Sequence, residues 1–343
     1  MSRLITMGAV LMLAACPLGT AHSQTQTSTV PNVRSMEVLY QLDDRSGSRP
    51  DGQLRELLAF HEGSGIGGGI YRWDKNIDKR NHNGGTVIDP SQDYQQNIDN
   101  VSVVGNQQDG VWTRVADEEG GTITELRDRD FVRAEWFGAL GNDNIDDYVA
   151  IQRALISTRR ANVKDGQQVW LGNDDVSLSE ETFLLSNRLL LNADDQLIGA
   201  CQWTEATKSL TVITTIAPHA DATGLNSLID IANGSKGAIV QGLRLVMNRD
   251  NFRVVKESSG VDSNRSGAVV RLIGSDTSIG IVNAQVNNCE IEGIDPPEGI
   301  DTHCGIQITG GNSTGIRIYG NQISNLSKGC LLYTSDAADN REV

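Results

Sequence analysis

An acidic segment near the C-terminal end of the chain carries residue types suited to acid–base chemistry. Residues 292–304 read EGIDPPEGIDTHC, and four of them are candidate catalytic residues: Asp295, Glu298, Asp301 and His303. Glycoside hydrolysis needs two carboxyl groups flanking the scissile bond, one protonated as the acid and one ionised as base or nucleophile. The three carboxylic acids are the candidates for that pair. The competing interpretation is a solvated loop, because Asp, Glu, Pro and Gly are ordinary turn residues.

A basic segment lies upstream, at residues 246–266. It holds four cationic side chains that we predict to bind substrate: Arg249, Arg253, Lys256 and Arg265. Elimination from a uronate needs a base for the C5 proton and a cation that neutralises the sugar carboxylate. Lys256, Arg265 and His303 would matter most for that reaction, and Ca²⁺ held by carboxylates is another source of the cation. The sequence requires no cofactor; Ca²⁺ is one option if the protein is a lyase, and we assign no metal ligands.

The composition indicates many short strands rather than a helical bundle. The 343 residues include 36 Gly and only 5% aromatic residues, which suits strands joined by tight turns. The formal net charge is −15, whereas a nucleic-acid-binding protein clusters Lys and Arg to displace counterions from phosphates. We therefore expect a mostly β protein with no nucleic-acid partner.

Three segments repeat one pattern of apolar residues around a Gly or Asn corner. They are Val240-x-Gly242-Leu243-x-Leu245, Val286-x-Asn288-Cys289-x-Ile291 and Ile318-x-Gly320-Asn321-x-Ile323. Such a unit cannot bury its apolar face alone, so neighbouring units must stack into a solenoid. Two inward columns are predicted: Ile231 with Leu272 and Ile308, and Leu245 with Ile291 and Ile323. The extra residues between repeats place the acidic and basic segments at one edge of the stack, where solenoids carry functional insertions.

One amphipathic helix is predicted between the β regions. Apolar residues recur at helical spacing from Tyr148 to Thr158, and Asp146 and Asp147 stand where a helix N-terminus favours carboxylates. Capping explains the position of both acids, so we assign them no catalytic role.

Several motifs surround this helix. They are Trp136-Phe137-Gly138-Ala139, Asp146-Asp147, Ala150-Ile151-Gln152 and the runs QVWLG, ETFLLSNRLLL and DDQLIGA. Together they resemble the entry segment of pectate-lyase-superfamily proteins. Upstream, GGGIYRWD, NGGTVI and GVWTRV are similar to the small module that often precedes this entry in phage tailspikes. The chain departs from the family pattern at Gly141-Asn142-Asp143-Asn144, where Gly-Asp-Gly is usual, and at Glu181-Thr182-Phe183, where Gly-Thr-Tyr is common.

The resemblance implies an all-β fold: a right-handed parallel β-helix (solenoid) with one N-terminal capping helix and a small preceding β module. We place the module at residues 35–130 and the β-helix at residues 131–329. The family implies a secreted polysaccharide lyase or glycoside hydrolase, here acting on a glycan that could be acidic. The alternative is a noncatalytic glycan-binding or adhesive β-helix, or a tailspike-like protein that would form a homotrimer. The sequence leaves the choice between catalysis and binding open.

The first 23 residues are predicted to be a signal peptide, followed by a polar linker at residues 24–34. A basic start, an apolar run and Ala21-His22-Ser23 fit that pattern. Leu13-Ala14-Ala15-Cys16 also resembles a lipobox, in which Cys16 would carry a lipid anchor. No other stretch is apolar for long enough to span a membrane. We expect export to the periplasm or the extracellular space, or attachment as an outer-membrane lipoprotein.

The end of the chain, residues 330–343, does not continue the repeat. The peptide CLLYTSDAAD matches the translation of a transposase adapter used in sequencing libraries. We therefore expect the native sequence to be truncated near Gly329, so that further coils are missing. The tail is expected to contribute nothing to fold or function. A natural C-terminal cap is the alternative, and it would be amphipathic or rich in aromatic residues.

Overall fold

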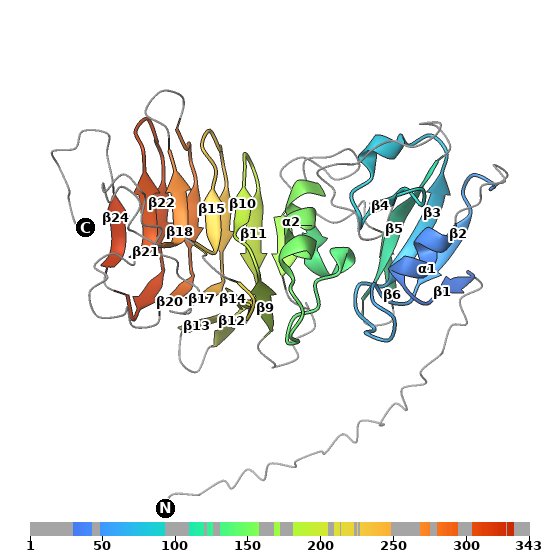
Figure 1. Ribbon diagram of the computed structural model, residues 1–343, viewed down its shortest axis with the longest axis horizontal. Helices are drawn as coiled ribbons and strands as arrows, with labels where there is room; N and C mark the ends of the chain where they lie inside the picture. The colour runs from blue at the N-terminus through green and yellow to red at the C-terminus, as the bar shows by residue number, and fades with distance from the viewer. Residues whose placement is uncertain are drawn as a thin grey trace, which may run out of the picture.

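The computed structural model has an elongated shape, with a small β module at one end and a stack of parallel strands at the other (Figure 1). Within the described residues, no helix is long and apolar enough to cross a membrane. The structure describes residues 30–42, 49–92, 110–119, 122–125, 131–157, 168–171, 181–204, 209–212, 214–222, 225, 227–247, 268–274, 280–293, 304–326 and 328–332.

The small module is a mainly antiparallel sheet with one short helix. Its strand order is β1-β2-β3-β5-β4, with β6 paired to β5, and only the β1–β2 pair is parallel among the described pairs. The runs GGGIYRWD, NGGTVI and GVWTRV contribute to β3, β4 and β5 respectively. The elements are β1 (Asn32–Val33), α1 (Met36–Gln41), β2 (Leu54–Leu57), β3 (Gly69–Asp74), β4 (Val87–Ile88), β5 (Val111–Glu119) and β6 (Thr122–Glu125).

Two tryptophans form the centre of the module's core. Trp73 and Trp112 are 7% and 0% exposed, and their rings meet edge to face with centroids 5.2 Å apart. Both tryptophans are therefore core residues of the module. Arg114, on the same strand as Trp112, is buried at 3% exposure and its guanidinium donates to the carbonyl of Gly67 at 2.7 Å. The same guanidinium lies 5.0 Å from the ring of Trp136, so it joins the module to the segment that enters the stack.

The entry segment contains a short strand, a 3-10 turn and the predicted helix. These are β7 (Phe131–Arg133), η4 (Ala134–Phe137) and α2 (Tyr148–Ser157). Asp146 caps α2, since its carboxylate accepts the Tyr148 N–H at 3.0 Å. Asp147 acts differently from the predicted capping role: its buried carboxylate accepts the N–H groups of Leu140 at 2.9 Å and Leu184 at 3.1 Å. That side chain therefore ties the entry segment to the first coil.

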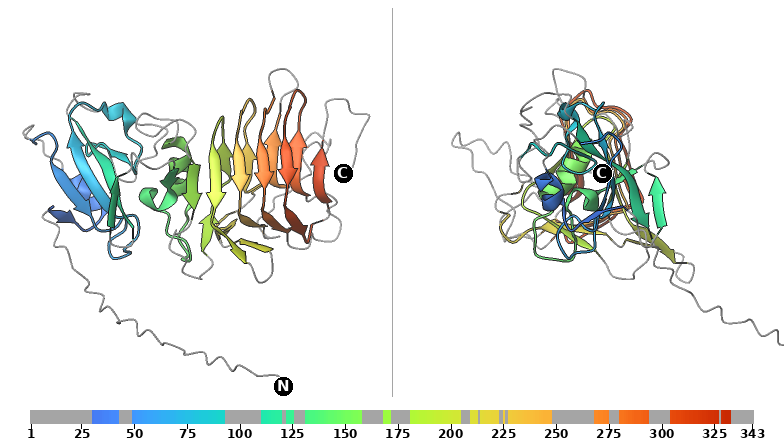
Figure 2. Two further views of the ribbon diagram at one scale, coloured as in Figure 1. Left: turned by 180° about the vertical axis from the view of Figure 1, so that it is seen from behind. Right: turned by 90° about the vertical axis from the view of Figure 1, so that its right-hand side faces the viewer.

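The remaining chain forms a parallel β-helix with three sheets, which confirms the predicted fold class. Each sheet is named after one of its strands. They are the β9 sheet (β9-β14-β17-β20-β23), the β10 sheet (β10-β15-β18-β21-β24) and the β11 sheet (β7-β8-β11-β16-β19-β22). Strands of each sheet stand side by side along the long axis, as the view from behind shows (Figure 2). One antiparallel hairpin, β12 (Cys201–Thr204) with β13 (Ser209–Val212), projects from the stack.

The strand bounds follow the chain around successive coils. They are β8 (Gln168–Leu171), β9 (Thr182–Leu185), β10 (Leu189–Leu191), β11 (Gln196–Gly199), β14 (Thr215–Pro218), β15 (Ile229–Ile231), β16 (Ile239–Gln241), β17 (Arg244–Met247), β18 (Ala268–Ile273), β19 (Gln285–Asn287), β20 (Glu290–Gly293), β21 (Cys304–Thr309), β22 (Arg317–Tyr319), β23 (Gln322–Ser324) and β24 (Lys328–Leu332).

Both predicted inward columns are present. Ile231 pairs with Leu272, which pairs with Ile308, and all three are at most 9% exposed. In the β9 sheet, Leu245 pairs with Ile291, and Ile323 follows in the next coil as a partly buried residue packed on the same core. Period-two alternation within parallel, in-register strands therefore builds the core.

The predicted corners are left-handed turns. Gly242, Asn288 and Gly320 have φ values of 66°, 53° and 67°, a conformation that favours Gly and, among other residues, Asn. Asn321, beside this corner, links two coils through its side chain. Its Oδ1 accepts the Cys289 N–H at 2.9 Å, and its Nδ2 donates to the Val286 carbonyl at 2.9 Å. Polar corner residues thus fix the register of one coil on the next.

The start of the C-terminal tail corrects one expectation. Cys330, Leu331 and Leu332 belong to β24 and pair with Ile306, Gln307 and Ile308 of β21. These tail residues extend the β10 sheet by one strand, because their backbone can pair with the preceding coil whatever their origin. The expectation that residues 330–343 contribute nothing to the fold is wrong for this part, while residues 333–343 lie outside the described residues.

Candidate functional site

The two polar segments picked from the sequence leave the stack at one corner. Met247 and Gly293, where β17 and β20 end, are register partners, and so are Ala268 and Cys304, where β18 and β21 begin. Both segments therefore run from the β9 sheet to the β10 sheet at equivalent places in adjacent coils. This confirms the prediction that the insertions share an edge. In the first coil the same corner is only the short link between β9 and β10.

The eight residues selected from the sequence all lie in these segments and outside the described residues, so their roles stay predictions. They are Arg249, Arg253, Lys256, Arg265, Asp295, Glu298, Asp301 and His303.

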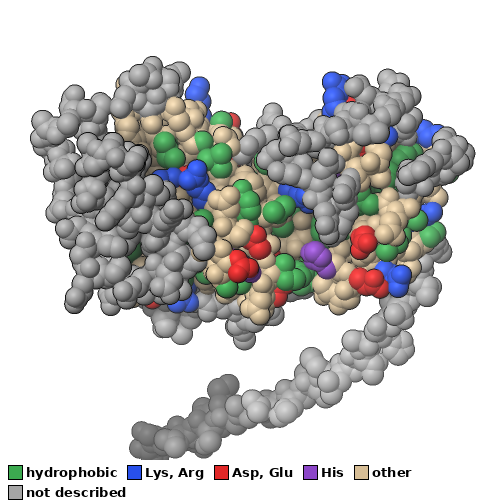
Figure 3. All heavy atoms as spheres, in the orientation of Figure 1, with side chains coloured by type: hydrophobic (Ala, Val, Ile, Leu, Met, Phe, Trp, Pro, Cys, Tyr) green, Lys and Arg blue, Asp and Glu red, His purple; other side chains and the backbone are tan. Residues whose placement is uncertain are grey.

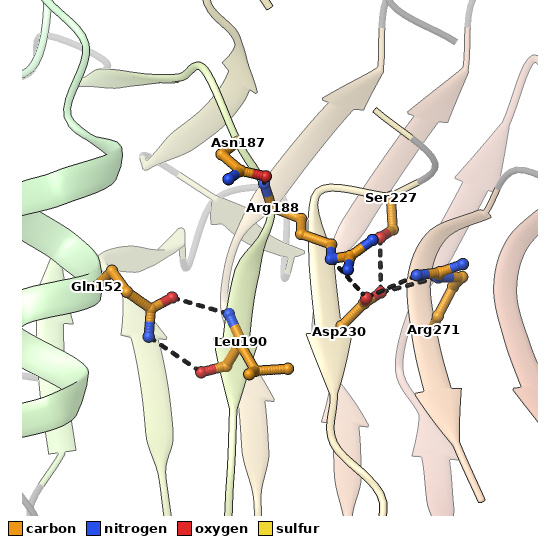
Figure 4. A network of polar contacts seen from close by, with 7 residues as sticks. All are labelled: Gln152, Asn187, Arg188, Leu190, Ser227, Asp230 and Arg271. Carbon is orange, nitrogen blue, oxygen red and sulfur yellow. Dashed lines mark hydrogen bonds and ion pairs between the residues drawn. The ribbon is translucent and has the colours of Figure 1, made fainter. Parts of the chain in front are cut away.

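A charged network lies on the outer face of the β10 sheet, next to this corner (Figure 4). Its centre is the carboxylate of Asp230, which is 1% exposed. Arg271 donates to both carboxylate oxygens, from Nε to Oδ1 at 2.8 Å and from Nη2 to Oδ2 at 2.6 Å. Ser227 donates its hydroxyl to Oδ1 at 2.6 Å, and the Nε of Arg188 lies 3.1 Å from Oδ2. Asp230 thus holds two guanidinium groups.

Strand alternation explains why this acid faces outward. Ile229 and Ile231 point into the core, so Asp230 between them must lie on the outer face of β15. Parallel pairing then places the outward residue of the next coil, Arg271, directly beside it. Arg188 reaches the same carboxylate from the link between β9 and β10, so three consecutive coils contribute to the network.

The two guanidinium groups differ in exposure. The side chain of Arg188 is 48% exposed and that of Arg271 is 18% exposed, against 1% for Asp230. Among the described residues, two cations share one carboxylate, so this network by itself carries one surplus positive charge on a protein whose formal net charge is −15. Arg188 approaches Asp230 through Nε, and about half of the Arg188 side chain is exposed.

This arrangement suits anion binding rather than proton transfer. Arg271 and Ser227 donate hydrogen bonds to the oxygens of Asp230, and Arg188 forms an ion pair with Oδ2, so the acid serves to hold the arginines in place. Held guanidinium groups recognise carboxylates and phosphates through charge-assisted hydrogen bonds.

A second ion pair lies on the neighbouring β9 sheet at the same corner. Arg244 of β17 donates from Nη2 to Oε2 of Glu292 in β20 at 3.1 Å, and both side chains are about one-third exposed, at 36% and 33%. Glu292 belongs to the acidic segment that the sequence singled out. Its engagement with Arg244 makes it a structural partner between coils rather than an unengaged acid.

The described residues give no support for a protein-held metal. They contain no group of three or more His, Cys, Asp or Glu side chains that could hold a metal ion. Ca²⁺, one option for a lyase, therefore stays untested, and its carboxylate ligands would come from the segments at 248–267 and 294–303.

Sequence reasoning missed Arg188, Asp230 and Arg271 although a signal for two of them was present. The partner strands align as Ile229-x-Ile231 and Val270-x-Leu272, and the residues at x are Asp and Arg. Opposite charges at the same outward position of adjacent coils are adjacent in a parallel, in-register stack. Arg188 lies outside the repeat, so only the structure could add it.

Comparisons with known proteins support the two-part architecture. A family model described as phage tail protein small four-stranded beta-sheet domain matches residues 41–117, within the small module. No curated protein sequence gives a significant match. Among solved structures, the chain is similar to the full-length tailspike protein 2 from the Escherichia coli O157:H7 bacteriophage CAB120, with a TM-score of 0.52 and 16% identity. It is also similar to the enzymatically active domain of tailspike protein 2 of bacteriophage CBA120, with a TM-score of 0.52 and 15% identity.

The matched region is a part of those longer proteins. The alignments cover 89% of this chain in both cases but 32% of the full-length tailspike and 36% of its active domain. At this level of identity the likeness concerns the fold. The chain thus combines a small β module, similar to the phage-tail domain model over residues 41–117, with a parallel β-helix fold similar to that of the tailspike structures.

Proposed function

We propose that this chain is an exported β-helix protein that targets a polysaccharide along the corner between the β9 and β10 sheets. The observation that carries the proposal is the convergence at this corner of two long polar segments and an arginine pair on the adjacent sheet face. The entry motifs that resemble the pectate-lyase superfamily support a polysaccharide as the ligand. The leader pattern of residues 1–23 supports export.

We further propose that the protein cleaves this polysaccharide. In hydrolysis, two of Asp295, Glu298 and Asp301 would serve as acid and as base or nucleophile. In elimination, His303 or Lys256 would take the C5 proton, and a nearby cation such as Arg265 or Ca²⁺ would neutralise the uronate carboxylate. One structural relative is named an enzymatically active domain, which supports catalysis on this fold.

A noncatalytic glycan-binding or tailspike-like protein is the second candidate. The observation that favours it is that Asp230 and Glu292, two of the described acids next to the corner, are engaged by arginines. A tailspike-like protein would be a homotrimer, so sedimentation analysis of the purified chain bears on this candidate.

Incubation with a panel of neutral and uronic-acid polysaccharides tests both proposals. Elimination leaves an unsaturated product that absorbs in the ultraviolet, hydrolysis leaves new reducing ends without that absorbance, and a binding protein gives neither. We expect products with the wild-type chain and none with the Asp295→Asn, Glu298→Gln, Asp301→Asn triple variant if hydrolysis is the reaction. If the wild-type chain neither binds nor cleaves any polysaccharide of the panel, the proposed function is wrong.

A further inference from the structure

We infer that Arg188 and Arg271, held by Asp230, form a subsite for the carboxylate of an acidic sugar. This inference rests on the proposed function and narrows the ligand class: the ligand is a uronate-containing glycan that contacts the outer face of the β10 sheet.

The first argument is the number of cations. Arg271 alone satisfies both oxygens of Asp230 with bonds of 2.8 Å and 2.6 Å, so a structural pair between the two coils is complete without Arg188. Arg188 adds a second positive charge to the same carboxylate, at 3.1 Å from Oδ2. Two guanidinium groups this close repel each other, and one carboxylate neutralises only one of them. A second anion, supplied by a ligand, would neutralise the other.

The second argument is preorganisation. A free arginine side chain loses much rotamer freedom when it binds an anion. Here Asp230 accepts a hydrogen bond from Ser227, which is fully buried, and Asp230 in turn restrains Arg188 through the ion pair at Nε. The terminal N–H groups of Arg188 remain on a side chain that is 48% exposed. A planar fork of donors matches the two oxygens of a carboxylate, so the ordering cost of binding is reduced in advance.

The third argument is the shape of the row in which these residues stand. The outward positions of four successive strands are Leu190, Asp230, Arg271 and Gln307, each in register with the next. Gln307 is only 4% exposed, so the accessible part of the row runs from Leu190 to Arg271, about 10 Å at a strand spacing of roughly 4.8 Å. Leu190 is 40% exposed and offers an apolar contact for the C–H groups of a sugar ring beside the cations. On this face of the molecule, Lys and Arg side chains gather near β15 beside hydrophobic ones (Figure 3).

The test compares Arg188→Gln with the wild-type chain. Affinities are measured by calorimetry for polygalacturonate, alginate and hyaluronate, and for the carboxyl-reduced form of each. We expect Arg188→Gln to weaken binding of the carboxylated polymers by about tenfold or more, because a charge-assisted bidentate contact is lost. Binding of the carboxyl-reduced polymers should be weak and equal in both proteins. Arg188→Lys should recover only part of the affinity, since it keeps the charge but not the fork.

Arg72→Gln is the matched control. Arg72 lies in β3 of the small module, its side chain is also 48% exposed, and it also faces a carboxylate, that of Asp74 at 3.7 Å. The Arg72→Gln variant should bind every polymer as the wild type does.

A second check concerns the stability of the test variant. The thermal unfolding temperature of Arg188→Gln should match that of the wild type closely, because the Asp230–Arg271 pair is retained.

The outcomes separate the inference from the proposed function. If the wild type binds neutral and carboxylated polymers equally, or Arg188→Gln binds as the wild type does, the subsite is wrong and a glycan-targeting function stands. If Arg188→Gln loses as much affinity for sulfated dextran as for uronates, the subsite is a general anion site and the carboxylate assignment fails. If the wild type binds no polymer, the proposed function and this inference fail together.

Discussion

Gln152 of α2 uses its side-chain amide as if it were one more residue of a strand opposite Leu190. Its Oε1 accepts the Leu190 N–H at 2.9 Å and its Nε2 donates to the Leu190 carbonyl at 3.2 Å (Figure 4). Leu190 lies in β10, the first strand of its sheet in the described residues. Open strand edges invite pairing with other chains. The entry helix therefore closes both the core and the backbone edge at this end of the stack.

Removing this amide should weaken the first coil measurably. We expect Gln152→Leu to lower the free energy of unfolding by about 1 kcal/mol, because two hydrogen bonds are lost and water can replace them only in part. Urea unfolding of the full chain measures the change. Val149→Ala, at a 46% exposed position of the same helix, is the control and should stay within about 0.5 kcal/mol. Equal stability of both variants would show that the amide contact contributes nothing.

The acid that ties the entry segment to β9 should make stability depend on pH. Burial raises the pKa of Asp147 from 3.8 to about 6. The folded chain therefore binds a proton more tightly than the unfolded chain, and this group destabilises the fold most above pH 6. The penalty is relieved as pH falls from about 6 towards 3.8.

The comparison that isolates this group is wild type against Asp147→Asn, unfolded in urea at a series of pH values. The wild type should gain about 2–3 kcal/mol relative to the variant between pH 6 and pH 4, because Asn does not titrate. Stability curves that stay parallel across this range would show that Asp147 has an ordinary pKa in the folded chain.

The inward column of the β9 sheet should not accept a charge. Ile291 is 1% exposed and lies between Leu245 and Ile323 of the neighbouring coils. We expect Ile291→Asp to cost several kcal/mol, since it buries an unpaired carboxylate in the stack. Urea unfolding is again the measurement. Glu290→Gln, one residue earlier on the outer face, should be nearly neutral, and a similarly small loss for Ile291→Asp would contradict the inward assignment.

The basic segment supplies a prediction that is independent of Arg188. Replacing Arg249, Arg253 and Lys256 together by Gln should weaken binding of uronic-acid polymers and reduce the salt dependence of that binding, because fewer counterions are exchanged. Binding to a neutral polymer should be unchanged. Weak binding that is equal for all polymers, and unaffected by the triple replacement, would refute the role of this segment.

The repeat pattern predicted the core because packing depends on short-range regularities. The columns through Leu272 and Ile291 could be read from alternation and from the Gly or Asn corners, which reflect local backbone geometry. The role of Asp147 could not, because its partners Leu140 and Leu184 meet only after the entry segment folds over β9.

The candidate site also has one part that the sequence predicts and one part that only the structure shows. The shared edge of the two segments followed from the repeat spacing alone, since insertions between aligned strands must leave at equivalent places. The network around Asp230 depends on a side chain from outside the repeat, Arg188, and on how far that side chain reaches across the sheet face. Spacing along the chain carries no information about such reach.

The shared corner also bears on how a protein of this kind can diverge. Each coil keeps its register through its own strands, as Leu245 with Ile291 and Ala268 with Cys304 show, whatever the length of chain between β17 and β18 or between β20 and β21. Closing a longer loop costs only about 0.6 kcal/mol for each doubling of its length. Segments at this corner can therefore be lengthened, shortened or exchanged during evolution while the scaffold persists, so ligand preference can change much faster than the fold.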